Sequence, residues 1–413
     1  MSTLQSFGLD AARALDPARY ALAGVAPRAA LRPASREEVA EALKAASRDA
    51  LAVVPWGGGA GLAREAAPPR YDLALDLGSL DRIVEYDPED LTLTAECGVT
   101  IETLRAALAA RGQELPLEAA RASRATLGGV LAANASGARR LRFGSPRDRI
   151  LGARFALPDG TLARTGGRVV KNVAGYGIHR LLCGSRGGLA LILEASLKLQ
   201  PAPEQRVALV FEADAAMLAD RALWAPFPRL EPAALSVLGA DAGASVAGLG
   251  GLGGLRGFSV ILGLEDEARW VEHQAAVATG ALGTPAARLE GADAARMWQS
   301  LADLEDREDA LLSFTTARNT PAALAPLLGR PEAAGLAFHV PAGRLMMPAD
   351  RAGAQELVRT LACEGFALIE ARGTGPLEPA IPPQAGVLAL RAQIRAALDP
   401  ASTLALGERW AAG

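Results

Sequence analysis

The residues best suited to bind a ligand form a glycine-rich loop in the first sixth of the chain. A short apolar run at residues 51–54 predicts a buried strand that ends at Pro55, and four of the next seven residues are glycine. Glycine adopts positive φ angles at little cost and has no Cβ, so such a loop can turn several backbone N–H groups toward one point. Convergent N–H groups bind anions, which indicates a phosphate or pyrophosphate site. Taken alone, the loop is equally compatible with a tight strand connection that binds nothing.

Two familiar phosphate-binding loops are excluded by the spacing. No Lys-Ser or Lys-Thr pair follows the glycines, as the P-loop of nucleotide triphosphatases requires. The dinucleotide pattern G-x-G-x-x-G also fails, because Leu62 or Arg64 occupies the place of its third glycine. A dinucleotide bound at this loop would therefore need another fold.

A second concentration of small residues lies between residues 115 and 144. It contains the runs Thr126-Leu127-Gly128-Gly129 and Asn134-Ala135-Ser136-Gly137. Small residues let main chains approach a flat ligand closely, and Thr126, Asn134 and Ser136 carry groups that can hydrogen-bond to it. The alanines between these runs are more typical of a helix packed closely in the core.

A third small-residue turn, G-S-R-G-G, occupies residues 184–188 and opens into an apolar strand at residues 189–199. Between the second and third runs, residues 166–176 form a glycine-bounded segment with Lys171 and Asn172. Lysines are otherwise found only at positions 44 and 198, and a lysine kept in a glycine-rich motif suggests a need for a compact ammonium group.

Length and composition restrict the class of protein. The chain has 413 residues, half of them hydrophobic, and a formal net charge of −3, which predicts a soluble protein of two or three domains with no general attraction to nucleic acid. Its three cysteines lie far apart, which argues against disulfides, a zinc site or a four-cysteine cluster. We find no secretory signal, and the most apolar window, residues 233–264, is too broken to span a bilayer. These features favour the cytoplasm.

The pattern of helices and strands predicts an α+β protein with a boundary near Pro203. Ser35 and Glu38 have capping-box spacing before a helix at residues 36–50, and strands alternate with helices up to residue 199. The second half predicts strands at residues 206–211, 257–263, 311–315 and 336–340. Helices are expected at residues 265–282, 292–304, 321–328, 352–364 and 385–398, and the block at residues 248–254 is expected to be a flexible loop.

The three glycine runs, in this order and spacing, resemble the FAD-binding domain of the vanillyl-alcohol oxidase / p-cresol methylhydroxylase superfamily. Within it, the chain is most similar to the FAD-binding subunit of bacterial glycolate oxidase, over residues 33–203 and again over the closing helix and Asp-Pro turn. The resemblance implies a two-subdomain FAD-binding domain plus an α+β cap with a largely antiparallel sheet. The implied division is a lead-in at residues 1–32, the FAD-binding domain at 33–203, the cap at 204–372 and a segment at 373–413 that returns to the FAD-binding domain.

The resemblance also implies which residues hold FAD. The first loop would hold the pyrophosphate, the second run would line the flavin and the third would contact the nucleotide. The implied residues are Gly57, Gly58, Gly59, Ala60, Gly61, Leu62, Thr126, Leu127, Gly128, Gly129, Asn134, Ser136, Gly137, Gly187, Gly188, Leu189 and Ile192. No histidine lies near the first loop, so we expect non-covalent FAD and no metal.

Catalytic residues are harder to assign. Oxidation of a 2-hydroxy acid needs a cation for the carboxylate and a base for the hydroxyl proton. Lys171 is a weak candidate beside the flavin, although an ammonium paired with an acid fits equally well. His339 is another, but an isolated histidine on an apolar strand is more often a core residue.

The resulting expectation is an FAD-binding subunit of a glycolate/D-lactate-type oxidase complex. Its implied partners are a sister FAD-containing subunit that performs the chemistry, an iron–sulfur subunit and a small 2-hydroxy acid, with contact to the inner face of the membrane only through those partners. Two alternatives remain, a self-sufficient FAD-dependent 2-hydroxy acid dehydrogenase and a non-redox scaffold that has lost FAD.

Overall fold

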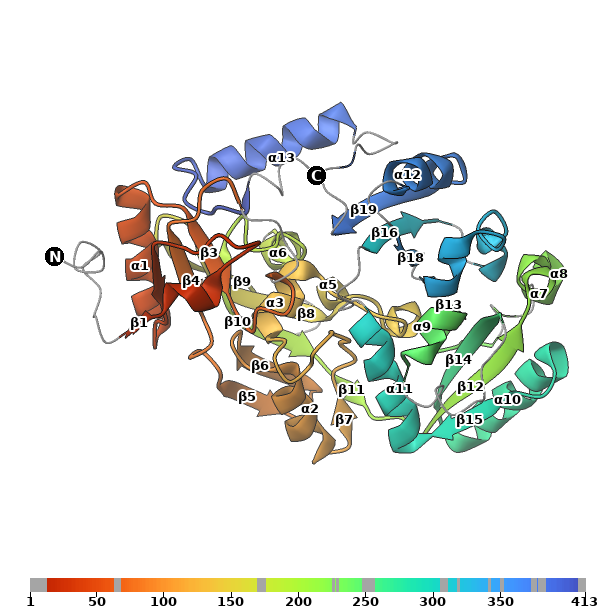
Figure 1. The fold of residues 1–413 in the computed structure, drawn as a ribbon. Helices are drawn as coiled ribbons and strands as arrows, with labels where there is room; N and C mark the ends of the chain where they lie inside the picture. Colours follow the sequence, from red (N-terminus) through yellow and green to blue (C-terminus); the bar gives the residue numbers. More distant parts are fainter. Residues whose placement is uncertain are drawn as a thin grey trace.

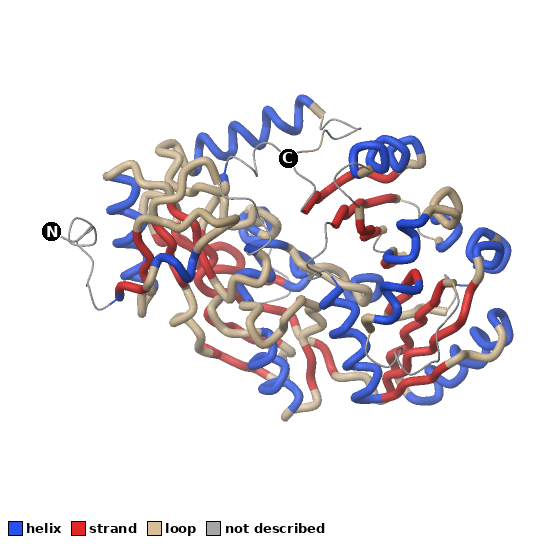
Figure 2. The backbone as a smooth tube through the Cα atoms, viewed as in Figure 1, coloured by secondary structure: helices blue, strands red, loops and turns tan. Residues whose placement is uncertain are grey.

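Two halves of the chain lie side by side, one with two small sheets and one built on a single large sheet (Figure 1). The structure is a computed structural model that describes residues 13–62, 68–168, 176–224, 227, 230–246, 257–304, 311–317, 320–340, 343–349, 353–372, 377 and 384–407. Helices and strands alternate in the first half, whereas helices flank the large sheet in the second (Figure 2).

The first sheet has the strand order β1-β2-β4-β3. It comprises β1 (Ala14–Leu15), β2 (Ala29–Leu31), β3 (Val53–Trp56) and β4 (Leu73–Asp76), of which the last three run parallel. Helix α1 (Arg36–Arg48) begins at Ser35, whose side chain accepts the N–H of Glu38 as the capping-box spacing predicts. Its Val39, Leu43 and Ala46 recur at helical spacing and pack against this sheet.

The second sheet is antiparallel, with the order β5-β6-β10-β8-β9. Its strands are β5 (Ile83–Asp87), β6 (Thr92–Glu96), β8 (Ile150–Ala156), β9 (Leu162–Gly166) and β10 (Leu191–Lys198). Helices α2 (Ile101–Ala109), α3 (Leu127–Ala133) and α6 (Ile178–Leu182) contribute apolar residues to its core. Short strands β7 (Gln113–Glu114) and β11 (Gln200–Pro201) pair beside it, and α4 (Arg140–Phe143) and α5 (Pro146–Arg149) connect α3 to β8.

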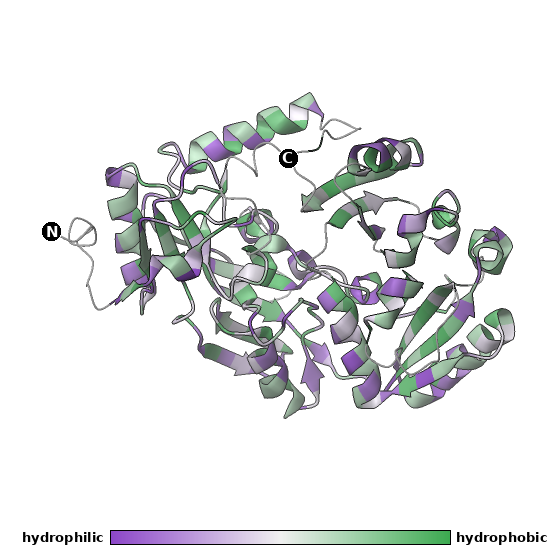
Figure 3. Cartoon of the chain, viewed as in Figure 1, coloured by the Kyte–Doolittle hydropathy of each residue, from purple (hydrophilic) through white to green (hydrophobic). Residues whose placement is uncertain are grey.

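The large sheet is antiparallel and has eight strands in the order β15-β12-β14-β13-β17-β18-β16-β19. They are β12 (Gln205–Ala213), β13 (Ala234–Gly239), β14 (Phe258–Asp266), β15 (Ala287–Glu290), β16 (Leu311–Thr316), β17 (Ala337–His339), β18 (Arg344–Pro348) and β19 (Phe366–Arg372). Much of the sheet is coloured as hydrophobic in Figure 3, in keeping with burial on both faces. We call residues 204–372 the cap.

Helices cover both faces of the cap sheet. Helices α7 (Ala215–Ala219), α8 (Arg221–Trp224), α10 (Ala268–Leu282) and α12 (Ala354–Cys363) share a core with one face. Helices α9 (Ala240–Ala244) and α11 (Gly291–Asp303) pack on the other face together with Ala138 from the first half of the chain. This second face is therefore the one that meets the first half.

A row of polar side chains crosses that face. Ser236 is paired in register with His339, His339 with Arg344, and Arg344 with Thr315. Directly opposite residues of antiparallel strands point to the same side of a sheet. Residues two positions along, Ala337 and Met346, pack with α11, so the row points to the same side as α11.

The C-terminal part of the chain returns to the first sheet. After helix α13 (Ala385–Leu398), Leu404 bridges Val53 in parallel, and Leu404 is completely buried against the strands of that sheet. Ile394 and Leu398 of α13 pack on the core of the second sheet, whereas Val387 and Leu390 are exposed.

The α+β class with an antiparallel cap sheet is confirmed, but several elements differ from the sequence-based expectations. Strands β13, β15, β18 and β19 were not predicted. The helix expected from residue 265 begins only at Ala268, because residues 265–266 complete β14, and residues 321–328 form a 3₁₀ helix only over Pro321–Leu324. The block at residues 248–254 lies outside the described residues.

Within the part of the chain that the structure describes, no helix combines the length and apolar character needed to cross a membrane.

The burial of Leu404 gives a stability prediction. Leu404→Ala should lower the free energy of unfolding by about 2–5 kcal/mol, because it removes a fully buried side chain and leaves a cavity. Leu390→Ala, at a site 56% exposed, should stay within about 0.5 kcal/mol and is the matched control. Denaturant unfolding measures both changes, and equal effects would contradict the docking of the tail on β3.

Candidate functional site

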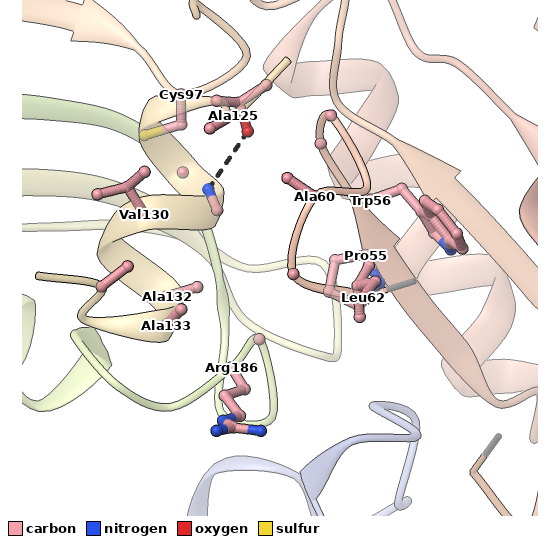
Figure 4. Close-up of a pocket in the computed structure, with 18 of the residues that line it drawn as sticks. Pro55, Trp56, Ala60, Leu62, Cys97, Ala125, Val130, Ala132, Ala133 and Arg186 are labelled. Carbon is pink, nitrogen blue, oxygen red and sulfur yellow. Dashed lines mark hydrogen bonds between the residues drawn. The ribbon is translucent and has the colours of Figure 1, made fainter. Parts of the chain in front are cut away.

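The site is a cleft lined by the three glycine runs, by neighbouring residues of the first half and, among the described residues of the cap, by Arg344. Its walls come from the loop after β3, from α3 and the segment before it, and from the strand β10 with the turn that precedes it (Figure 4). The lining residues are Pro55, Trp56, Gly57, Gly58, Gly59, Ala60, Gly61, Leu62, Leu77, Cys97, Ala119, Ala120, Ala125, Thr126, Gly128, Gly129, Val130, Ala132, Ala133, Ala135, Arg186, Gly187, Ala190, Leu191, Ile192 and Arg344.

The first loop is pressed against the start of α3. A Cβ added to Gly57 would lie 2.1 Å from Thr126 Oγ1, and one added to Gly58 would lie 1.5 Å from the carbonyl oxygen of Arg124. Gly59 has a φ of +72°, a conformation that favours glycine. Arg124 also donates from Nη2 to the Gly58 carbonyl oxygen over 3.1 Å. Only glycine allows the two runs to approach this closely.

The start of α3 is held by backbone contacts as well. Thr126 is the N-cap of α3, and its Oγ1 accepts the N–H of Gly129 over 3.3 Å. The Gly128 N–H donates to the Cys97 carbonyl oxygen over 2.7 Å, and a Cβ at Gly128 would lie 2.9 Å from Cys97 Cβ. The main chain of the second run therefore sits directly on the end of β6.

The third run turns toward the first through two residues with positive φ. Arg186 has φ +53° and Gly187 has φ +75°, and a Cβ on Gly187 would lie 2.6 Å from Pro55 Cγ. Gly188 faces elsewhere, because its added Cβ would meet Gly407 at 2.9 Å. The C-terminal tail thus supports the third run from behind.

Eleven of the cofactor residues implied by the sequence line the cleft. They are Gly57, Gly58, Gly59, Ala60, Gly61, Leu62, Thr126, Gly128, Gly129, Gly187 and Ile192. The structure brings these together from three separate parts of the chain.

The remaining six, Leu127, Asn134, Ser136, Gly137, Gly188 and Leu189, are not among the lining residues. Leu127 and Leu189 belong to the core of the second sheet. Asn134 Oδ1 accepts the N–H of Arg147 over 3.1 Å, and Ser136 Oγ accepts from Arg140 Nη1 over 3.5 Å. Gly137 packs against Glu118, with an added Cβ only 2.7 Å from Glu118 Oε2. Their contact with FAD stays a prediction.

The two weak catalytic candidates are not seen at the cleft. Lys171 lies outside the described residues. His339 is completely buried in the cap, its Nδ1 is 2.8 Å from Ser236 Oγ, and it does not line the cleft. Burial, with a smaller effect of Arg344, lowers the pKa of His339 to about 3, so its ring is neutral at physiological pH.

Arg344 is the functional candidate that sequence reasoning missed. Among the described lining residues the charged side chains are Arg186 and Arg344, and Arg344 comes from the cap. No motif surrounds Arg344, and it is brought to the cleft by the pairing of β18 with β17 and β16. The position of Arg344 at the cleft follows from the strand register of the cap sheet.

The lining fits a flavin dinucleotide. Positions 57, 58, 128 and 187 present main chain where any Cβ would collide with a neighbouring segment, so backbone groups form part of the cleft surface. Alanines at 119, 120, 132 and 133 contribute small apolar side chains to the lining, and the guanidinium groups of Arg186 and Arg344 suit anionic groups. Among the described residues, no cluster of His, Cys, Asp and Glu side chains could hold a metal ion.

Comparison with known proteins agrees with this fit. Residues 27–166 match the family described as FAD binding domain. The chain is 35% identical to glycolate oxidase subunit GlcD of Bacillus subtilis over 45% of this chain and 39% of that protein. It is 43% identical to glycolate oxidase subunit GlcE of Escherichia coli over 33% of this chain and 39% of that protein. It is also 33% identical to a D-lactate dehydrogenase of Archaeoglobus fulgidus over 51% of this chain and 45% of that protein.

Solved structures with much lower identity share the fold. p-Cresol methylhydroxylase superposes with a TM-score of 0.71 at 18% identity, covering 92% of this chain and 88% of that chain. An alkyldihydroxyacetonephosphate synthase superposes with a TM-score of 0.67 at 16% identity, covering 92% and 77%.

The sequence matches are partial, because the alignments span less than half the length of each of these three relatives. The family match at residues 27–166 covers the first two glycine runs of the cleft, whereas the third run and Arg344 lie beyond it. Residues 27–166 therefore match the FAD binding domain family, FAD is the cofactor, and the chain has the fold of p-cresol methylhydroxylase.

Proposed function

We propose that this chain is the FAD-binding subunit of a glycolate/D-lactate-type 2-hydroxy acid oxidase complex. The observation that carries the proposal is Arg344, a cation that the cap contributes to a cleft otherwise made of the three glycine runs. The partial similarity to two glycolate oxidase subunits and to a D-lactate dehydrogenase supports the same substrate class.

Bound FAD would supply a redox centre that receives the two electrons of the acid by way of the sister subunit. The chain's own residues bind the flavin and an anionic group beside it. Arg344 provides a planar guanidinium that can bind a carboxylate through two N–H groups. Because Arg344 is fixed between the neighbouring strands β17 and β16, it holds the carboxylate from the cap side of the cleft.

The described lining is poor in groups that could remove a proton from the hydroxyl. Its described side chains include no carboxylate, imidazole or amine, and burial raises the pKa of the Cys97 thiol well above its ordinary value. His339 is neutral but enclosed in the sheet. This composition favours a subunit that binds flavin and anion while a sister FAD-containing subunit carries out the full reaction.

The partners in this proposal are the sister FAD-containing subunit and an iron–sulfur subunit that passes the electrons onward. The place of action is the cytoplasm, at the inner face of the membrane through these partners. FAD is held without a covalent bond, since His179, His273 and His339, the histidines of the chain, are not among the described lining residues.

The second candidate is a self-sufficient FAD-dependent 2-hydroxy acid dehydrogenase. Arg344 supports this second candidate equally, because a self-sufficient dehydrogenase would also need a cation to bind the carboxylate of its substrate. The two candidates differ in whether this chain alone transfers electrons from the acid.

Anaerobic reduction separates the candidates. The purified chain, reconstituted with FAD, should show a flavin spectrum that D-lactate or glycolate does not bleach, and bleaching should follow when the partner subunits are added. Bleaching by the acid at a rate fit for turnover would establish the self-sufficient dehydrogenase instead. Failure to bind FAD after reconstitution would indicate the scaffold alternative and overturn the proposal.

The close approach of the first two glycine runs predicts a loss of cofactor affinity. Gly58→Ala should weaken FAD binding about 10-fold or more, ~1.4 kcal/mol, because its Cβ would force the loop away from the Arg124 carbonyl. Gly280→Ala on α10 is the matched control, since Gly280 does not line the cleft and a Cβ at this position has no neighbour within 4 Å. Fluorescence titration of the apoprotein with FAD measures both, and equal dissociation constants would refute the proposed packing.

The proposed role of Arg344 predicts a substrate-specific defect. Arg344→Met should weaken 2-hydroxy acid binding by about 1.5–3 kcal/mol, the contribution of a charged hydrogen-bonded pair, and Arg344→Lys should lose less. Perturbation of the flavin spectrum by the acid measures this affinity in the chain itself. Arg154→Met, which removes an exposed ion pair with Glu194, should leave it unchanged. If Arg344→Met binds the acid as tightly as the unaltered chain, Arg344 is not its anchor.

A further inference from the structure

Four charged side chains form a closed ring where the cap meets the FAD binding domain. Arg139 Nη2 donates to Glu114 Oε1 over 2.7 Å and to Glu265 Oε2 over 2.6 Å. Arg206 donates from Nη2 to Glu114 Oε2 over 2.7 Å and from Nε to Glu265 Oε1 over 3.0 Å. Each carboxylate therefore receives both guanidinium groups, and the ring has no net charge.

The ring joins separate layers of the molecule. Glu114 ends β7, and Arg139 immediately precedes α4, both in the FAD binding domain; Arg206 lies on β12 and Glu265 on β14 of the cap. The Glu265 side chain is completely enclosed, and the Arg139 side chain is 9% exposed. Burying such charges is favourable only when every partner is in place, so loss of one side chain leaves uncompensated charge.

Arg139 also holds the wall of the cleft through its own main chain. Its backbone N–H donates to Glu118 Oε2 over 2.8 Å. Glu118 directly precedes Ala119 and Ala120, which line the cleft. Burial raises the pKa of Glu118 to about 7, while Arg139 opposes this shift, and the second carboxyl oxygen of Glu118 has no hydrogen-bond partner. Arg139 is thus the link between the ring and the cleft.

Helix α11 of the cap also hydrogen-bonds to the wall that contains Ala119. Gln299 of α11 donates from Nε2 to the Ala119 carbonyl oxygen over 2.9 Å and accepts from Arg105 Nη1 over 2.6 Å. Asp303 of α11 accepts the N–H of Arg121 over 2.8 Å. The wall of residues 118–121 is therefore fixed between the ring and helix α11.

We propose that Arg139 is a positioning residue for the flavin cleft: the ring that it closes fixes the cap against the wall of residues 118–121 and so sets the shape of the cofactor site. Arg139 itself does not line the cleft. It acts through Glu118 and through the cap strands β12 and β14. The proposal depends on FAD binding and not on the identity of the substrate.

The test compares FAD affinity in variants of the full chain. Arg139→Met keeps an unbranched apolar side chain but removes the charge and the donors of the guanidinium, and should weaken FAD binding about 10-fold while altering the visible absorption band of the bound flavin. Arg139→Lys keeps the charge and should recover part of both. Arg154→Met, at an exposed ion pair on β8, is the control and should match the unaltered chain.

A purely structural ring would behave differently. If Arg139→Met lowers the melting temperature of the apoprotein but leaves the FAD dissociation constant within twofold, and the flavin spectrum unchanged, the proposal is overturned. Should Arg139→Met fail to fold, Gln299→Ala removes the grip of α11 on the Ala119 carbonyl without opening the ring. It should weaken FAD binding about threefold or more, and an unchanged affinity would equally overturn the proposal.

No substrate enters these measurements. A failure of 2-hydroxy acids to reduce the flavin would therefore reject the proposed reaction and leave the role of Arg139 standing.

Discussion

The close approach of the Gly57 and Gly58 main chain to residues 124–126 is the contact on which the rest of the site depends. With added Cβ positions 2.1 Å and 1.5 Å from atoms of the second run, no other residue type permits this geometry. The first run follows β3 of the first sheet and the second leads into α3, which packs on the second sheet, so their contact joins the two sheets at the cleft. The third run, supported from behind by Gly407, completes it. Because these glycines have no side chains, backbone groups form the surface that a dinucleotide would contact.

This dependence explains how much of the site could be predicted from the sequence. Glycines 57–59, 128 and 187 are visible in the sequence because a steric requirement fixes their residue type. Asn134 and Ser136 stand in an equally suggestive run, yet Asn134 accepts from the Arg147 N–H and Ser136 from the Arg140 side chain. A polar side chain in such a motif can stabilise the turn instead of binding a ligand. The spacing of the motif alone does not distinguish these two roles.

The cap was harder to predict for a different reason. The strand at β17 was predicted, but β18 is short and its central residues are all buried and apolar, so it shows no clear alternating pattern. Arg344 gains its place only because β18 pairs with β17 and β16, which the order of elements along the chain does not reveal. A glycine required by close packing can be recognised in the sequence by its residue type. A residue positioned by sheet register has no such feature in the sequence.

In the row Ser236–His339–Arg344–Thr315, the guanidinium of Arg344 lies beside His339, whose imidazole is neutral. His339 lies beside Arg344, and a protonated imidazole there would be both enclosed and next to a like charge. Its pKa falls to about 3, and Ser236 Oγ lies 2.8 Å from Nδ1. The positive charge of this row is therefore concentrated on Arg344 at the cleft. The buried ring between the cap and the FAD binding domain is electrically neutral, so it can hold the two halves together without competing for the anion that we propose Arg344 binds.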